Sequence, residues 1–241
     1  ISQLCYNHLK RLQNIGIANG AVLVIDNLQH TVLAYAGSQD YSDPYYSGQV
    51  DGIKAIRSPG STLKPLAYAL AFDRGLITPK TMLADVPVNY DGFSPENFDM
   101  RYHGLISAED ALSASLNIPA VHLLEKIGIP DFREKLLEAG CRSFAKQHQL
   151  GLSTILGGCG MTLEELCGLY AAFANNGSYL PIRYNQAHLR KKDSVQIIST
   201  SAAYLLSSIL TKMNRSDLPN LFENSLHIPK VAWKTGTSYG R

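Results

Sequence analysis

The order of hydrophobic patterns along the 241-residue chain restricts it to an α+β fold with separated layers. Two apolar runs of strand length, 21–26 and 31–36, are joined by the short polar segment 27–30 and predict a β-hairpin. From 61 to about 213 the apolar residues recur mostly at helical spacing, and a strand-like run returns only at 230–235. We therefore predict an antiparallel sheet packed with a mainly helical subdomain, and not a βαβ repeat.

Composition and length fit one domain. Hydrophobic residues make up 45% of the chain and charged residues 17%, which excludes disorder. We expect a sheet part at about 1–40 and 228–241 and a helical part at about 61–213. The net charge of +2 provides no strong field for nucleic acid or an anionic membrane, so neither is an expected partner. No run of about 18 apolar residues occurs, and the chain begins at Ile1, so it reads as a fragment of a larger protein.

The cysteines and histidines do not indicate a metal site. Cys5, Cys141, Cys159 and Cys167 form no C-x-x-C pair, and no histidine lies near them at ligand spacing. The sequence allows one disulfide among these cysteines but does not indicate which two would form it. No metal or organic cofactor is expected.

The segment 59–65, Pro-Gly-Ser-Thr-Leu-Lys-Pro, contains a candidate nucleophile. Pro65 is tolerated only in the first turn of a helix, so a helix should begin near Ser61. A helix N-terminus favours an oxyanion, and Lys64 lies one turn further on the same face. A lysine with a lowered pKa can take the serine proton. Taken alone, S-x-x-K is common, and an N-capping serine with a solvated lysine is the alternative.

Two further short motifs bear polar side chains suited to a cleft. Ser115 and Asn117 follow a predicted helix, and both side chains can face one cleft if the backbone turns there. The hydroxyl could relay a proton, and the amide could hold a substrate carbonyl.

The strand-like run near the C-terminus ends in Lys234, Thr235, Gly236 and Thr237. The cation and the two threonine hydroxyls suit a carboxylate. Gly236 has no side chain, which would let a ligand lie against the strand.

The order and spacing of S-x-x-K, S-x-N and K-T-G resemble those of penicillin-binding proteins and serine β-lactamases. The likeness extends over almost the whole chain. Segments 21–38, 57–65 and 111–121 are similar to the transpeptidase domains of class A penicillin-binding proteins, and Asn97-Phe98-Asp99 is most like type 1C.

This resemblance implies a serine D,D-transpeptidase of cell-wall synthesis, acting on peptidoglycan stem peptides that end in D-Ala-D-Ala and inhibited covalently by β-lactams. Ser61 is then the acylated nucleophile, Lys64 its base and Ser115 the proton relay, with Lys234 keeping that relay electrostatically poised. The implied oxyanion hole is formed by the backbone N–H groups of Ser61 and Thr237.

The substrate-binding residues implied by the resemblance are Asn117, Lys234, Thr235, Gly236 and Thr237. Asn117 would hold the substrate amide, and the hydroxyls of Thr235 and Thr237 would hold the terminal carboxylate. The implied location is the periplasm, or the outer face of the cytoplasmic membrane.

Several departures from the family are visible. Neither the glycosyltransferase domain nor the signal-anchor helix is present, so membrane attachment is expected only through parts absent from this chain. The family continues past K-T-G into two strands and a closing helix, whereas seven residues follow Lys234 here. We therefore expect a C-terminally truncated sheet, a poorly placed last strand and a poorly active fragment.

Three related functions remain as alternatives. A class A β-lactamase needs an E-x-x-L-N segment after S-x-N, but the nearest string, 109–113, precedes Ser115 and ends in serine. A D,D-carboxypeptidase shares every motif. A β-lactam sensor without turnover would be acylated as well.

Overall fold

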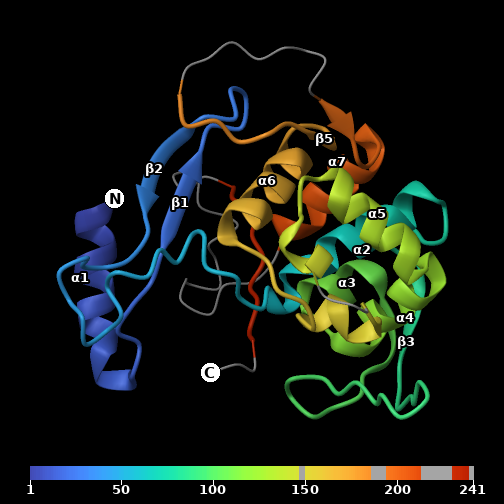
Figure 1. Cartoon of the computed structure of the whole chain (residues 1–241). Helices are drawn as coiled ribbons and strands as arrows, with labels where there is room; N and C mark the ends of the chain where they lie inside the picture. The colour runs from blue at the N-terminus through green and yellow to red at the C-terminus, as the bar shows by residue number, and fades with distance from the viewer. Residues whose placement is uncertain (147–149, 186–193, 213–229, 239–241) are drawn as a thin grey trace. The chain divides into compact units, whose positions relative to one another are not determined.

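A computed structural model describes residues 1–146, 150–185, 194–212 and 230–238. The chain divides into two compact units. The first contains 1–57, 136–146 and 160–197, and the second contains 58–135, 147–159 and 198–241. Figure 1 shows the course of the chain through both units.

The first unit contains the predicted hairpin. Strand β1 (Val22–Ile25) pairs antiparallel with β2 (Val32–Ala36), with Leu23 opposite Tyr35. Asp26 shapes the turn between them, since its carboxylate accepts hydrogen bonds from the N–H groups of Leu28 and Gln29. The remaining elements of this unit are α1 (Ser2–Leu12), the 3-10 helices η1 (Gln13–Ile15) and η3 (Ser143–Lys146), α6 (Leu163–Ala174) and the short strands β5 (Ser178–Tyr179) and β6 (Val195–Gln196).

A capping box opens α6, as the sequence predicts. The Thr162 hydroxyl accepts from the N–H of Glu165 at 3.1 Å, and the Glu165 carboxylate accepts from the N–H of Thr162 at 3.0 Å. The other carboxylate oxygen of Glu165 accepts from the backbone N–H groups of Arg142 and Ser143. This glutamate therefore joins the start of α6 to the segment around η3.

Removal of this cap should destabilise the protein. We expect Thr162→Ala to lower the free energy of unfolding by about 1 kcal/mol, because the N–H of Glu165 loses its acceptor. Denaturant titration measures the change. Thr200→Ala, at an exposed position in another helix, is the matched control. Equal stability of the two variants would contradict the capping role.

The second unit is built around α2 (Lys64–Asp73), which is buried from Lys64 to Phe72. A helix that is apolar on all sides belongs in a core. It packs against α3 (Ala108–Ser113), α4 (Asn117–Ile127), α7 (Thr200–Leu210) and the 3-10 helix η4 (Leu152–Leu156) (Figure 1). The helix α5 (Ile129–Glu138) begins in this unit, and its last residues belong to the first.

The sequence analysis missed two small sheets. In the second unit, β3 (Met82–Asp85) pairs antiparallel with β4 (Gly104–Ser107), and in the first unit β5 pairs with β6. Long segments, and not hairpin turns, separate the paired strands. Each strand has at most four residues, so neither sheet gives a hairpin signal in the sequence. The described sheets are thus three antiparallel pairs, and the α+β class is confirmed.

The prediction of a strand at 230–235 is wrong for the part of the chain that the structure describes. Residues 230–238 form no strand, and they group with the helical unit instead of the hairpin. A strand needs a hydrogen-bonded neighbouring strand, and none is paired with this segment among the described residues. The Trp233 N–H donates instead to Leu210 O at 3.4 Å, in helix α7. Residues 228–229 and 239–241 of the expected sheet part lie outside the described residues.

Two further findings concern the cysteines and membranes. The structure contains no disulfide between the four cysteines, all of which lie in its described part. Within the described ranges, no helix is both long and apolar enough to cross a bilayer.

Candidate active site

Ser61 lies in the 3-10 turn η2 (Gly60–Leu63), directly before α2. The α-helix itself begins at Lys64, three residues later than the sequence predicts. The turn is tighter because the N–H of Thr62 bonds to Pro59 O, three residues back, at 3.2 Å. Lys64 therefore lies one helical turn after Ser61, as predicted. The Lys64 side chain is completely buried.

The second motif occupies a sharp turn between two helices. Helix α3 ends at Ser113, Ser115 has a positive φ of 57°, and α4 begins at Asn117. A positive φ is uncommon for a residue with a side chain and costs conformational energy. The backbone turns as the sequence analysis expected, and Ser115 and Asn117 line one cavity and both lie near Lys64 Nζ.

Lys64 joins the first motif to the second. Its Nζ donates to Ser115 O at 2.6 Å and to Asn117 Oδ1 at 2.6 Å, and Ser115 Oγ lies 3.5 Å away. Burial lowers the pKa of Lys64 well below its usual value, and the charge of nearby Lys234 lowers it further. A neutral amine has two N–H groups and one lone pair. In a neutral Lys64, the two short bonds would occupy both N–H groups and leave the lone pair free to accept a proton.

Lys234 reaches the same serine from the C-terminal segment. Its Nζ donates to Ser115 Oγ at 2.7 Å and to Thr235 O at 2.8 Å. Burial lowers the pKa of Lys234 to about 8. Because Ser115 Oγ accepts from this lysine, its own proton remains available for another acceptor.

One cavity of about 530 Å³ connects the three motifs. That volume is in the range of small-ligand sites. Of the predicted site residues, five line it: Ser61, Ser115, Asn117, Thr235 and Thr237.

Ser61 itself does not contact its proposed base. Among the described residues, its hydroxyl has no hydrogen-bond partner, and Lys64 Nζ is directed toward Ser115 and Asn117 instead. Catalytic hydrogen bonds often tighten only when substrate is present.

Gly60 and Gly236 bring the C-terminal segment against the nucleophile turn. Gly60 has a φ of +55°, and a methyl group in place of its hydrogen would lie 2.5 Å from Thr237 O. A methyl group at Gly236 would lie 2.6 Å from Pro59 O and 2.7 Å from the side chain of Thr62. The Cβ direction of Gly236 is therefore occupied by Pro59 and Thr62, so a side chain does not fit there, and the expected contact of this segment with a ligand stays a prediction.

The close approach at Gly236 gives a testable consequence. Gly236→Val should move residues 234–237 away from the nucleophile turn and reduce acylation by β-lactams by about a hundredfold, as expected for a displacement near 1 Å. Acylation rate and melting temperature should be measured together. Gly92→Val is the control, because nothing lies within 4 Å of Gly92, although its φ of +95° adds local strain there as well. Unchanged acylation by a folded Gly236→Val variant would contradict this packing.

The comparisons with known proteins agree with this geometry. Residues 20–240 match the penicillin-binding protein transpeptidase domain family. The chain belongs to this family. Penicillin-binding protein 1C of Escherichia coli (strain K12) is 39% identical over 225 residues, which cover 91% of this chain and 28% of that protein. Penicillin-binding protein 1F of Bacillus subtilis (strain 168) is 35% identical over 67% of this chain and 22% of its own length.

Solved structures confirm the fold of this transpeptidase domain. The transpeptidase domain of penicillin-binding protein 3 from Burkholderia pseudomallei superposes with a TM-score of 0.70 at 20% identity, over 87% of this chain and 67% of that one. PonA1 from Mycobacterium tuberculosis gives a TM-score of 0.70 at 19% identity, over 88% of this chain and 60% of that one. The expected resemblance to class A transpeptidase domains, and to type 1C, is confirmed. The chain spans only about a quarter of the length of the two curated relatives.

The sequence analysis missed one wall of the transpeptidase cavity. Residues 93–98 and Met100, in the segment between β3 and β4, line it together with the motif residues. Asn97 was noted only for its likeness to type 1C, without a role. A buried asparagine in a polar loop gives no signal of burial in a single sequence.

Proposed function

We propose that this chain is a serine D,D-transpeptidase domain that crosslinks peptidoglycan stem peptides through an acyl-enzyme at Ser61. The observation that supports it most is the meeting of three motifs at one cavity. Ser61, Ser115 and Thr235 are far apart in the sequence, yet all line it, and the buried Lys64 bonds to the second motif. A buried lysine whose pKa is lowered is a typical general base for a serine nucleophile.

Acylation begins with attack of Ser61 Oγ on the carbonyl carbon between two D-alanines. The serine proton passes to the lone pair of neutral Lys64, and the electron pair of the C=O bond moves to its oxygen. The backbone N–H groups of Ser61 and Thr237 would stabilise that oxyanion. Thr237 supports this role because its backbone lies against Gly60, the residue before Ser61.

Release of the terminal D-alanine requires a proton on its nitrogen. Ser115 would donate it, since its oxygen already accepts from Lys234. The C–N bond breaks, its electrons stay on the nitrogen, and the ester at Ser61 remains. Ser115 recovers its proton from Lys64, whose Nζ lies 3.5 Å from Ser115 Oγ.

Substrate orientation is assigned to the other motif residues. The hydroxyls of Thr235 and Thr237, with the charge of Lys234 nearby, would hold the terminal carboxylate, and Asn117 would hold the donor amide. An amine of a second stem peptide then attacks the ester carbon and loses a proton to Lys64. The bond between the acyl carbon and Ser61 Oγ breaks, Lys64 returns the proton to Ser61 Oγ, and the crosslinked peptide leaves the regenerated enzyme. β-Lactams would acylate Ser61 by the same first step.

The cellular setting follows from the family. The proposed reaction crosslinks stem peptides outside the cytoplasmic membrane, so we place this domain in the periplasm or at the outer face of the cytoplasmic membrane. Membrane attachment and glycan polymerisation would be functions of other parts of a longer protein.

The test is the product distribution from a stem-peptide donor ending in D-Ala-D-Ala with an amine acceptor, using the intact protein. A transpeptidase yields the crosslinked peptide with release of D-alanine. Release of D-alanine with water alone as acceptor would indicate the D,D-carboxypeptidase alternative, and acylation without product would indicate a sensor. Rapid hydrolysis of penicillin would indicate a β-lactamase. Each of the last three outcomes contradicts the proposal.

A further inference from the structure

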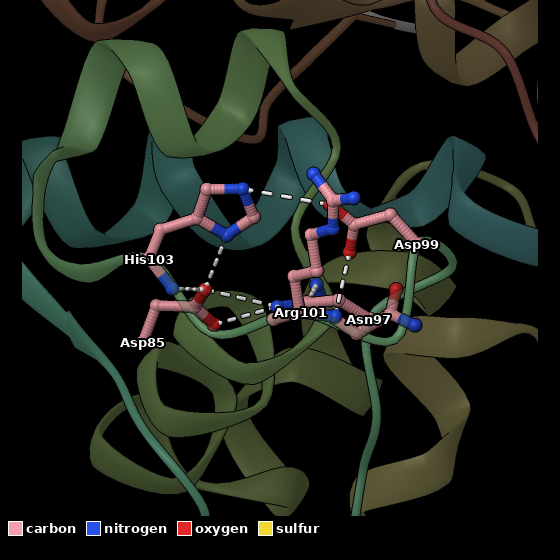
Figure 2. A network of polar contacts seen from close by, with 6 residues as sticks. Asp85, Asn97, Asp99, Arg101 and His103 are labelled. Atoms are coloured by element: carbon pink, nitrogen blue, oxygen red, sulfur yellow. Dashed lines mark hydrogen bonds and ion pairs between the residues drawn. The ribbon is translucent and has the colours of Figure 1, made fainter.

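A polar network joins the buried end of β3, at Asp85, to the segment that leads to β4 (Figure 2). At its centre is the carboxylate of Asp85, which is fully buried. It accepts from Asn97 Nδ2 at 2.9 Å on both oxygens, from the His103 N–H at 2.8 Å and from His103 Nδ1 at 2.8 Å. A buried carboxylate is costly unless its oxygens are hydrogen-bonded, so Asp85 strongly favours this arrangement of its partners.

Asp85 fixes the orientation of the Asn97 amide. The Asn97 Nδ2 donates to Asp85 and to Arg101 O at 2.8 Å, so it cannot exchange places with the oxygen without losing these bonds. Asn97 Oδ1 is consequently directed to the N–H of Asn117, at 2.8 Å. This N–H belongs to the first residue of α4, whose N-cap Leu116 provides no side-chain bond. Asn97 therefore caps α4 from 20 positions back in the chain.

The same loop also holds the side chain of Asn117. Its Nδ2 donates to Glu96 O at 2.5 Å, and its Oδ1 accepts from Lys64 Nζ at 2.6 Å. Residues 96 and 97 thus fix both the backbone and the amide of Asn117. Through that amide they set the position of the lysine amine.

We infer that Asn97, held by Asp85, is a positioning residue that places Asn117 and Lys64 for acylation. Asn97 is only 3% exposed, and both ends of its amide bond to protein groups, so it acts through Asn117 and not on substrate. The inference rests on the proposed function, since Lys64 is assigned there as the base. It adds a polar connection from β3 to the catalytic lysine: Asp85, Asn97, Asn117, Lys64.

The main test measures acylation of the intact protein by a chromogenic β-lactam at increasing concentration. Asn97→Ala should lower the limiting acylation rate about ten- to a hundredfold, the effect of a small displacement of a catalytic group. The β-lactam concentration that gives half of the limiting rate should change much less than the limiting rate itself. Asn89→Ala is the matched control, because Asn89 lies in the same loop and its amide bonds only to Ser94 and Gly92. An unchanged limiting rate for Asn97→Ala overturns the inference. A lower limiting rate that is fully explained by a smaller folded fraction of the variant also overturns the inference.

An exchange of the two side chains separates positioning from folding. Asn97→Asp alone places two carboxylates in contact and should acylate slowly. Adding Asp85→Asn to this variant restores an amide donor and a carboxylate acceptor between positions 85 and 97. The double variant should therefore recover much of the acylation rate. A double variant no faster than Asn97→Asp overturns the link between Asp85 and Asn97.

A failure of the proposed function gives a different result. If the wild-type protein forms no adduct at Ser61, the proposed function is wrong. The positioning inference is then decided by a crystal structure of Asn97→Ala. Retention of the 2.6 Å bond between Lys64 Nζ and Asn117 Oδ1 in that structure would contradict the inference.

Discussion

Ser61→Ala should abolish covalent labelling by penicillin and formation of the crosslinked product. The cavity reaches the Ser61 side chain, whose hydroxyl has no hydrogen-bond partner among the described residues, so its loss should not unfold the protein. Without this oxygen no acyl-enzyme forms, and the expected effect is a complete loss of adduct, measured by mass spectrometry of the intact protein.

Ser58→Ala is the control for the Ser61 variant. The Ser58 hydroxyl donates to Gly157 O at 2.7 Å, so its role is structural. We expect this variant to retain labelling in its folded fraction. Persistent labelling of Ser61→Ala would mean that another residue is the nucleophile.

Lys64→Arg should lower the acylation rate by about a hundredfold or more, as for loss of a general base. The substitution keeps a cation, but a guanidinium stays protonated and cannot take the serine proton. In the wild-type protein, burial and the charge of Lys234 lower the pKa of Lys64, which increases the neutral fraction near neutral pH. The wild-type rate should therefore rise with pH through this lowered pKa, and stopped-flow acylation measures both effects.

The control for Lys64→Arg is Lys80→Arg, an exposed lysine paired with Glu109. Melting temperatures of both variants are needed, because Lys64 is completely buried and arginine is larger. Near-normal acylation by Lys64→Arg would assign the proton transfer to another group.

The sequence predicted the elements whose signals are local. Gly16, Gly75, Gly128 and Gly140 come just after helices, where glycine typically ends them, and Ser107 and Thr162 are caps of a type that the sequence pattern indicates. The turn at Ser115 and the burial of Lys64 agree with the chemistry expected of the motifs. The glycine ends, the caps and the turn at Ser115 depend on residues close together in the chain, whereas the burial of Lys64 was expected only from the chemistry of the motif.

The features that the sequence did not predict depend on distant residues. Strands β3 and β4 pair across a long segment, and the role of Asn97 arises only when its loop folds back on α4. The close packing of Gly236 against Pro59 and Thr62 joins residues that are distant in the sequence, so it was not predicted, and the ligand contact expected at Gly236 stays a prediction. The run 230–235 has strand composition, yet no strand pairs with it among the described residues.

The central claim is that Ser61 is the acylated residue of a transpeptidase domain. The most direct measurement is incubation of the intact wild-type protein with a labelled penicillin, followed by proteolysis and mapping of the modified peptide. The account predicts a single adduct on Ser61, within the segment from Pro59 to Pro65. An adduct on any other serine, including Ser58 or Ser115, would contradict it.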